Sequence, residues 1–190
     1  MIPDVRLTDR RRVAALRDMG LLTDTPEEAY DRFTRLAAAI VEAPIALFTV
    51  ITDEEQFFRS QVGLPEPVAT TRRTPLSHSF CQYVILSSAP LRVEDARVHP
   101  VVKGNPAIEE LNAIAYLGVP LITRRGETLG SLCAVDHEPR EWTDRDQSVL
   151  RDLAAATVTE VELRRTTREA VELASRLEAA LRGGKKEPTA

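Results

Sequence analysis

The sequence predicts an α+β fold: a central antiparallel sheet of five or six strands with helices packed on one face and a long C-terminal helix. Three observations support this prediction. Two helical patterns open the chain, two pairs of strand-like segments are each joined by a short polar turn, and an uninterrupted helical pattern closes the chain. Helices grouped before and after the strands, rather than alternating with them, favour a layered antiparallel architecture.

Composition indicates one globular domain of about 150 residues with flanking segments. The 190 residues are 43% hydrophobic and 28% charged, which is enough apolar material for a core. The longest apolar run, residues 43–48, is far too short for a membrane span, and the first twelve residues have no signal-peptide core. The net charge of -4 argues against nucleic acid or membrane partners. We therefore expect a cytoplasmic protein.

The first two elements are predicted to be helices. Val13, Leu16 and Met19 recur at helical spacing in residues 9–22, and Gly20 is the expected stop. Thr25 followed by Pro26 resembles an N-cap and a first helical residue, so a second helix should run from there to about residue 42. The apolar face expected for this second helix is Phe33, Leu36, Ala37 and Ile40.

The next elements are predicted to form a hairpin and a crossing loop. Residues 45–51 are apolar on both alternating faces, as in a central strand. Residues 56–62 alternate, with Phe58 on one face and Arg59 on the other, and read as the antiparallel partner. Residues 63–75 hold three prolines without periodicity and are expected to be loop.

The second half of the sheet is predicted to contain another hairpin. Two strong strand patterns flank a polar connection that contains Gly126, a residue suited to the positive φ of a tight turn. The expected elements before and within this hairpin are a short helix at 77–86, a strand at 91–93, an irregular stretch at 95–106, one helical turn at 107–111, and strands at 114–122 and 129–135.

The last helix is predicted to start at Thr143 and to continue until Gly183. Within it a heptad pattern suggests a two-stranded coiled-coil seam between two copies of the chain, and a solvated helix with incidental leucines is the alternative. The seam residues are Leu163, Ala170, Leu173 and Leu177. The expected boundaries are an N-terminal arm at 1–8, the domain at 9–160, a signalling-helix extension at 161–182 and a disordered tail at 183–190.

Several local sequences resemble the GAF domain, in the version found at the N-terminus of bacterial signalling proteins. The matching segments are LRDMGLL at 16–22, QFFRS at 56–60 with VGL at 62–64, SFC at 79–81, VEDAR at 93–97, YLGVPL at 116–121 and LGSLCAVD at 129–136. The resemblance covers about residues 9–160. It implies a GAF/PAS-like sensory or dimerisation module with a pocket between the sheet and the segments laid over it.

The resemblance implies no particular ligand, and the cofactor is unknown. The cyclic-nucleotide signature of the family is not found, and neither cysteine is followed by the histidine of bilin-binding members, because Gln82 follows Cys81 and Ala134 follows Cys133. Tyr83 stands where related domains often have a histidine. Polar and aromatic residues in the family's pocket-lining regions are the candidate ligand-binding residues, with a structural role as the alternative for each: Phe58, Arg59, Ser60, Phe80, Cys81, Asp95 and Tyr116.

The two cysteines are the candidates for covalent chemistry. His78 and Cys81 have the spacing that shares one helix face, so a reactive Cys81 is one hypothesis and a small buried core residue is the other. A disulfide between Cys81 and Cys133 requires Cα atoms within about 7 Å. No histidine stands at a metal-ligand spacing, so no metal is predicted.

The sequence thus predicts a non-enzymatic sensory domain that binds a small molecule and signals as a helix-linked homodimer. A downstream signalling protein, or an output domain outside this sequence, is the further expected partner. The alternatives are a thiol-based redox sensor or reductase centred on Cys81, with Cys133 as its second thiol, and a ligand-free dimerisation scaffold. The one enzymatic member type considered, the free methionine sulfoxide reductase, has its cysteines in segments that find no match here.

Overall fold

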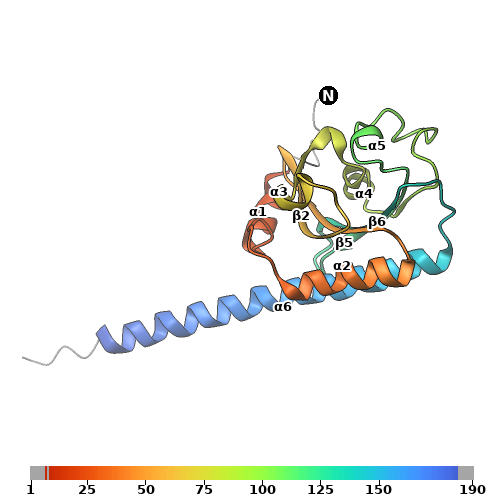
Figure 1. The fold of residues 1–190 in the computed structure, drawn as a ribbon. Coiled ribbons are helices and arrows are strands. Elements are labelled where there is room, and N and C mark those ends of the chain that lie inside the picture. Colours follow the sequence, from red (N-terminus) through yellow and green to blue (C-terminus); the bar gives the residue numbers. More distant parts are fainter. Residues whose placement is uncertain (1–6, 8, 184–190) are drawn as a thin grey trace, which may run out of the picture.

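The computed structural model describes residue 7 and residues 9–183, which form three layers (Figure 1). A sheet is the middle layer, long helices cover one of its faces, and short helices with loops cover the other. Apart from Leu7 and Gly183, the predicted arm at 1–8 and tail at 183–190 lie outside the described residues.

The sheet has six strands in the order β3-β2-β1-β6-β5-β4, and each neighbouring pair is antiparallel. The two predicted hairpins meet at its centre, where Leu47 lies opposite Cys133. The predicted antiparallel sheet is therefore confirmed. The strands are β1 (Ile45–Ile51), β2 (Glu55–Val62), β3 (Arg73–Pro75), β4 (Leu91–Val93), β5 (Ala115–Ile122) and β6 (Thr128–Asp136).

The long helices form the layer on one face of the sheet. They are α1 (Arg10–Asp18), α2 (Glu28–Val41) and α6 (Asp144–Gly183), and in Figure 1 α2 and α6 run side by side beneath the sheet. Tyr30 of α2 packs edge-on against Phe48 of β1, with ring centroids 5.3 Å apart. Leu117 of β5 and Val158 of α6 belong to the same buried cluster, so this layer is closed by continuous apolar packing.

Short elements cover the opposite face. The segment predicted to be loop contains α3 (Val68–Thr71) and the edge strand β3, which pairs with the start of β2. Pro75 is the last residue of β3, where an edge strand tolerates a residue without an N–H, and Pro67 precedes α3 as its N-cap residue. The remaining elements are the 3-10 helix η1 (Leu76–His78), α4 (Cys81–Ser87) and α5 (Ala107–Glu110).

Helix α2 differs from its sequence prediction at its start and in its buried face. It begins at Glu28, because the Thr25 carbonyl accepts a hydrogen bond from Arg59 and Glu27 is the extended N-cap residue. Its buried residues are Tyr30, Thr34, Ala37 and Val41. Of the face predicted from the sequence, Ala37 is buried, whereas Leu36 and Ile40 are 41% and 47% exposed.

Helix α6 starts where the sequence predicts and then leaves the domain. Thr143 and Asp146 form a reciprocal capping box: Asp146 N donates to Thr143 Oγ1 at 3.1 Å and Thr143 N donates to Asp146 Oδ2 at 2.9 Å. From Thr166 to Arg182 every residue of the helix is exposed, and this part projects away from the domain (Figure 1). Within the described part of the chain, no helix has the length and apolarity to cross a bilayer.

Candidate functional site

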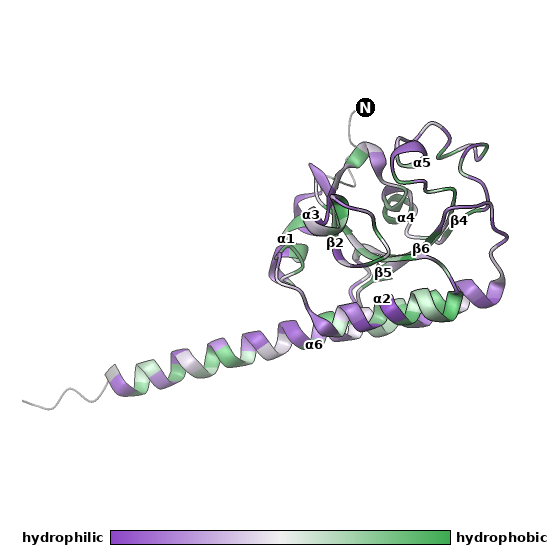
Figure 2. Ribbon diagram, in the orientation of Figure 1, coloured by the Kyte–Doolittle hydropathy of each residue, from purple (hydrophilic) through white to green (hydrophobic). Residues whose placement is uncertain are grey.

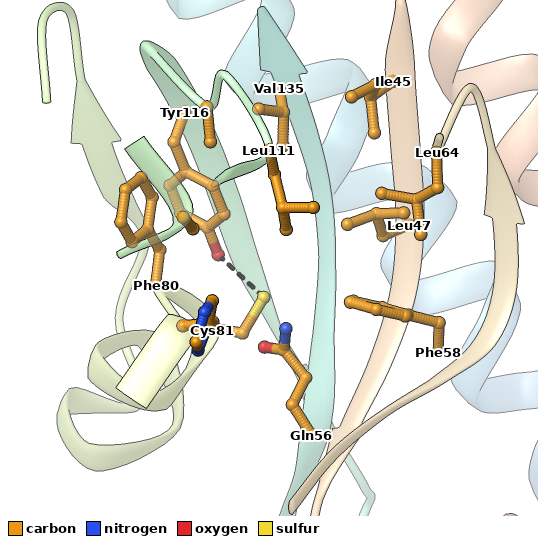
Figure 3. Close-up of a pocket in the computed structure, with 13 residues that line it drawn as sticks. Ile45, Leu47, Gln56, Phe58, Leu64, Phe80, Cys81, Leu111, Tyr116 and Val135 are labelled. Atoms are coloured by element: carbon orange, nitrogen blue, oxygen red, sulfur yellow. Dashed lines mark hydrogen bonds between the residues drawn. The ribbon is translucent and has the colours of Figure 1, made fainter. Parts of the chain in front are cut away.

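A cavity of about 40 Å³ lies between the sheet and the short elements that cover it (Figure 3). Strands β1, β2, β5 and β6 form its floor, and the start of α4 and the region of α5 form its cover. The lining is mainly apolar with four polar side chains: Ile45, Leu47, Gln56, Phe58, Leu64, His78, Phe80, Cys81, Ala107, Leu111, Ala113, Tyr116 and Val135.

The volume of this cavity limits what it encloses. An apolar cavity of about 150 Å³ admits benzene, and drug-sized ligands occupy about 300–1,000 Å³. A cavity of about 40 Å³ therefore encloses a molecule of a few heavy atoms. A tetrapyrrole or a dinucleotide requires the cover to move.

Four of the seven candidate ligand-binding residues line the cavity: Phe58, Phe80, Cys81 and Tyr116. Phe80 packs edge-on against Tyr116, with ring centroids 5.5 Å apart, so the cover and the floor meet through two aromatic rings (Figure 3). The other three residues, Arg59, Ser60 and Asp95, lie elsewhere.

Arg59 and Ser60 both point to the helix layer, Arg59 because it alternates with Phe58 and Ser60 because β2 carries a bulge. Phe48 of β1 lies opposite Ser60 and the next residue lies opposite Phe58, so Arg59 has no partner of its own. The extra residue reverses the alternation. Ser60 Oγ therefore lies 2.6 Å from Thr34 Oγ1 of α2 and donates to Asp31 Oδ1 at 2.5 Å.

Asp95 occupies a surface turn. Its carboxylate accepts hydrogen bonds from the backbone N–H of Arg97 at 3.0 Å and from Arg97 Nε at 2.8 Å. These hydrogen bonds and the positive charge of Arg97 lower the pKa of Asp95. The residue closes its own turn and has no contact with the cavity.

Arg59 links the sheet to α6. Its side chain is 1% exposed, donates to the Thr25 carbonyl at 2.7 Å and lies 3.8 Å from Glu27, and burial lowers its pKa. Glu27 also accepts from Arg164 of α6 at 2.6 Å. Both guanidinium groups also lie over the ring of Tyr30, at 5.0 Å for Arg59 and 5.6 Å for Arg164 from the ring centroid.

Two polar residues of the cavity, Gln56 and His78, were missed as ligand contacts by the sequence reasoning. Gln56 lies two residues before Phe58 in the same strand, so strand alternation alone would have placed both side chains on the same face. Its amide donates to Thr74 Oγ1 at 3.0 Å, and its carbonyl accepts from Ser79 Oγ at 2.5 Å. His78 contacts Glu110 at 3.0 Å, so η1 and α5 are joined across the cover.

The two cysteines meet at the edge of the cavity. Cys81 Sγ lies 3.8 Å from Cys133 Sγ. Tyr116 donates a hydrogen bond to Cys81 Sγ at 3.3 Å (Figure 3). The ring of His78 hydrogen-bonds with Ser77 and Glu110 instead of pairing with Cys81. The neighbours of the thiol are thus Cys133 and Tyr116, which come from strands far from Cys81 in the sequence.

These surroundings shift the two thiol pKa values in opposite directions. Burial opposes ionisation of Cys81, but the neighbouring side chains of Cys133, Ser131, Tyr116 and Thr49, which can donate to the thiolate, outweigh it and lower the Cys81 pKa. Burial, together with its hydrogen bond to Cys81, raises the pKa of Cys133. Cys81 is therefore the thiol that ionises first, and Cys133 keeps its proton.

The predicted seam residues lie on the outer side of α6. Leu163, Leu173 and Leu177 are 59%, 68% and 60% exposed, and Ala170 is exposed as well. The adjacent turn is fixed to the domain on its other side, since Arg165 pairs with Asp18 at 2.9 Å.

In the described residues, no group of three or more His, Cys, Asp or Glu side chains is arranged to hold a metal ion.

A six-stranded antiparallel sheet with a covered cavity on one face and a long helix on the other defines a three-layered α+β domain. The chain belongs to the GAF domain family, whose sequence profile matches residues 25–161. This confirms the resemblance found in the sequence.

Comparison with known proteins gives one curated relative and several similar structures. The chain is 33% identical to the cyclic di-GMP phosphodiesterase PA2567 of Pseudomonas aeruginosa over 161 residues, which is 84% of this chain and 27% of that protein. The GAF domain of a phosphoenolpyruvate-protein phosphotransferase from Coxiella burnetii is 20% identical with a TM-score of 0.63, covering 83% of this chain and 96% of that one.

Another structural neighbour is the blue-light-absorbing form of the PixJ GAF domain from Thermosynechococcus elongatus. It is 12% identical with a TM-score of 0.62, covering 86% of this chain and 95% of that one. At this level of identity the likeness shows the shared fold alone.

The curated relative corrects one prediction. We expected a protein that is not an enzyme, and this expectation is contradicted because the relative matched over most of the chain is named as a phosphodiesterase. The chain spans about a quarter of that protein's length.

Proposed function

We propose that this chain is a sensory domain that regulates hydrolysis of cyclic di-GMP by binding a small molecule in its cavity and repositioning α6 in a homodimer. The observation that carries the proposal is the position of β5, which lies between the cavity and α6. Tyr116 of β5 lines the cavity, and the next residue, Leu117, packs in the cluster that contains Val158 and Val161 of α6. The name of the curated relative supports the link to cyclic di-GMP.

Regulation through β5 requires two arrangements of the domain. A ligand changes their populations only if it binds one of them more tightly. A molecule in contact with Tyr116 favours the arrangement in which the ring makes room for it, and the strand carries that displacement to Leu117 and α6. The chain of ion pairs from Arg59 through Glu27 to Arg164 supports a second connection between sheet and helix.

The homodimer is supported by apolar residues that this chain leaves exposed. Leu173 and Leu177 lie beyond the domain on α6, and Leu36 and Ile40 lie on the outer side of α2. Figure 2 shows apolar positions recurring along the projecting part of α6. A helix with such a stripe buries it against a second helix, and an identical helix supplies the same heptad pattern.

Native mass spectrometry of the freshly purified chain tests ligand and dimer together. We expect the mass of two chains plus a small molecule that is lost on denaturation. A dimer at the bare sequence mass would contradict ligand binding and favour the ligand-free dimerisation scaffold. A monomer at micromolar concentration would contradict the seam.

Introducing charged side chains at the seam tests the seam itself. Leu173→Glu combined with Leu177→Glu places like charges on the seam, so we expect monomers that retain the helical circular dichroism of the domain. Ser175→Glu is the control, since residue 175 is exposed and lies on the opposite side of α6. If the double variant keeps the dimer mass, the helices pair elsewhere.

Filling the cavity tests its regulatory role. Ala113 is buried and lines the cavity, so Ala113→Leu occupies much of a space of about 40 Å³. In the natural protein that carries this domain, we expect a changed rate of cyclic di-GMP hydrolysis. The control is Ala179→Leu, on the exposed part of α6. Equal rates for both variants and wild type would contradict regulation through the cavity.

A further inference from the structure

We propose that Cys81 and Cys133 form a reversible intrachain disulfide when a hydroperoxide enters the cavity, with Cys81 as the attacking thiolate and Cys133 as the resolving thiol. This site is a redox modification site, and it stands independently of the proposed regulation of cyclic di-GMP hydrolysis. Its two sulfur atoms are 3.8 Å apart and both residues are buried.

The backbone around the pair favours bond formation. A disulfide has an S–S length of about 2.05 Å, so the sulfurs must approach by roughly 1.8 Å. Cys133 is held in the central strand β6, whereas Cys81 is the first residue of α4, a helix of seven residues in the cover. The short cover segment, rather than the sheet, supplies the movement.

The two thiols are not equivalent. Cys81 lines the cavity and accepts the hydrogen bond of Tyr116, whereas Cys133 lies outside the lining and behind it. A small oxidant that reaches the cavity therefore meets Cys81 first. The lowered pKa of Cys81 and the raised pKa of Cys133 agree with this assignment.

Two buried hydroxyls beside the pair support an anionic sulfur. Within the described part of the chain, Thr49 Oγ1 and Ser131 Oγ are buried and make no hydrogen bond by ordinary geometric criteria. Buried polar groups without partners are costly and call for an explanation. Both hydroxyls lower the pKa of Cys81, so the Cys81 thiolate is the acceptor that accounts for them.

The reaction balances with one hydroperoxide. The Cys81 thiolate attacks one peroxide oxygen, the O–O bond breaks, and the leaving hydroxide (alkoxide for an organic hydroperoxide) takes up a proton, which leaves a sulfenic acid on Cys81. Cys133 then attacks that sulfur, its proton goes to the departing hydroxide, and water leaves as the S–S bond forms. Two thiols and hydrogen peroxide thus give one disulfide and two waters.

The bond would join the cover to the floor of the cavity. Cys81 belongs to α4 and Cys133 to β6, so oxidation fixes α4 against the sheet. Larger ligands need the cover to move. Oxidation should therefore restrict entry to the cavity and make it dependent on the thiol redox state.

Mass spectrometry of the oxidised chain tests the proposal. The reduced protein, freed of reductant, is treated with hydrogen peroxide in the presence of glutathione, then denatured with N-ethylmaleimide. We expect a monomer that has lost two hydrogen atoms and takes up no maleimide, and dithiothreitol should restore two reactive thiols. If both cysteines still take up maleimide once the glutathione is fully oxidised, the proposal is wrong.

Two serine variants assign the roles of the thiols. Cys133→Ser should stop with one added oxygen on Cys81, trapped by dimedone, because no resolving thiol is present. Cys81→Ser should oxidise at least about tenfold more slowly, because Cys133 keeps its proton. Rapid oxidation of Cys133 in the second variant would overturn the assignment. Circular dichroism confirms that each variant is folded, and the wild-type measurement decides the disulfide by itself.

The pH dependence separates an activated thiol from a merely buried one. The rate of sulfenic acid formation follows the thiolate fraction, so it rises as the pH passes through the Cys81 pKa. Tyr116→Phe removes a donor to the thiolate and raises that pKa, so the midpoint of the rate profile should move to higher pH. An unchanged midpoint would contradict the activation of Cys81 by this site.

Discussion

The two faces of the sheet are built from the same strands but are closed in different ways. On one face, long helices pack over alternate residues such as Phe48, Leu117 and Leu132, and the core is continuous. On the other face, short helices and loops leave a cavity with polar groups at its edge. The helix face therefore holds the fold together, and the cavity face provides the room and the chemistry for a site.

Long helices close their face of the sheet with a continuous core because each supplies an unbroken apolar stripe. Short segments such as α4 and α5 cannot offer such a stripe, and their polar groups must find individual partners. His78 with Glu110, and Gln56 with Ser79, are examples on the cavity face. The interactions there are fewer and more specific, which suits a region that opens or reacts.

The largest expected effect compares leucine truncations on the two faces. Leu132 of β6 is fully buried in the helix-face cluster, so Leu132→Ala should cost about 3–5 kcal/mol of unfolding free energy. Leu47 of β1 borders the cavity and has fewer contacts to lose, so Leu47→Ala should cost about 2 kcal/mol. Urea unfolding measures both. An equal or larger cost for Leu47→Ala would remove the distinction between the faces.

A smaller effect is expected at Gly118, which shapes the cavity face. A Cβ atom there would lie 2.1 Å from the hydroxyl oxygen of Tyr116, because the tyrosine ring leans over this glycine to reach Cys81. Gly118→Ala should displace the ring and cost about 1–3 kcal/mol by overpacking. Urea unfolding gives the cost. No loss of stability would mean that the ring moves freely and that its hydroxyl is not held at the thiol.

The smallest change in unfolding free energy is expected at the ion pairs that join the sheet to α6 on the helix face. Glu27 lies between Arg59 and Arg164, so Glu27→Gln removes the anion between two cations and should cost about 1 kcal/mol at low salt, and less at high salt. The matched control is Glu28→Gln, at an exposed ion pair with Arg35, for which no measurable change is expected. Thermal melts at two salt concentrations provide the comparison, and equal melts for the two variants would contradict the link.

Sequence patterns predicted the elements that local physical chemistry governs. The buried strand at 45–51, the hairpin around Gly126 and the helix start at Thr143 all form as expected, because alternation, turn geometry and capping each act within a few residues. Four of the seven candidate ligand-binding residues also line the cavity, because segments marked by the resemblance to the family lie around it.

Other predictions failed where distant contacts decide the outcome. The bulge at Arg59 depends on pairing with β1, and it turns Ser60 from the cavity face to the helix face. The buried face of α2 depends on how the helix rotates against the sheet, so it includes Thr34 and Tyr30 and leaves Leu36 exposed. Neither feature has a signal in the local sequence.

The sequence by itself determined the class of fold, the order of its elements and its membership of the GAF family, because hydrophobic periodicity and turn residues act locally. Only the tertiary structure decided the size of the cavity, the 3.8 Å approach of Cys81 to Cys133 and the surroundings of Tyr116. These features arise from strand register and helix packing, which bring together residues that no spacing along the chain connects.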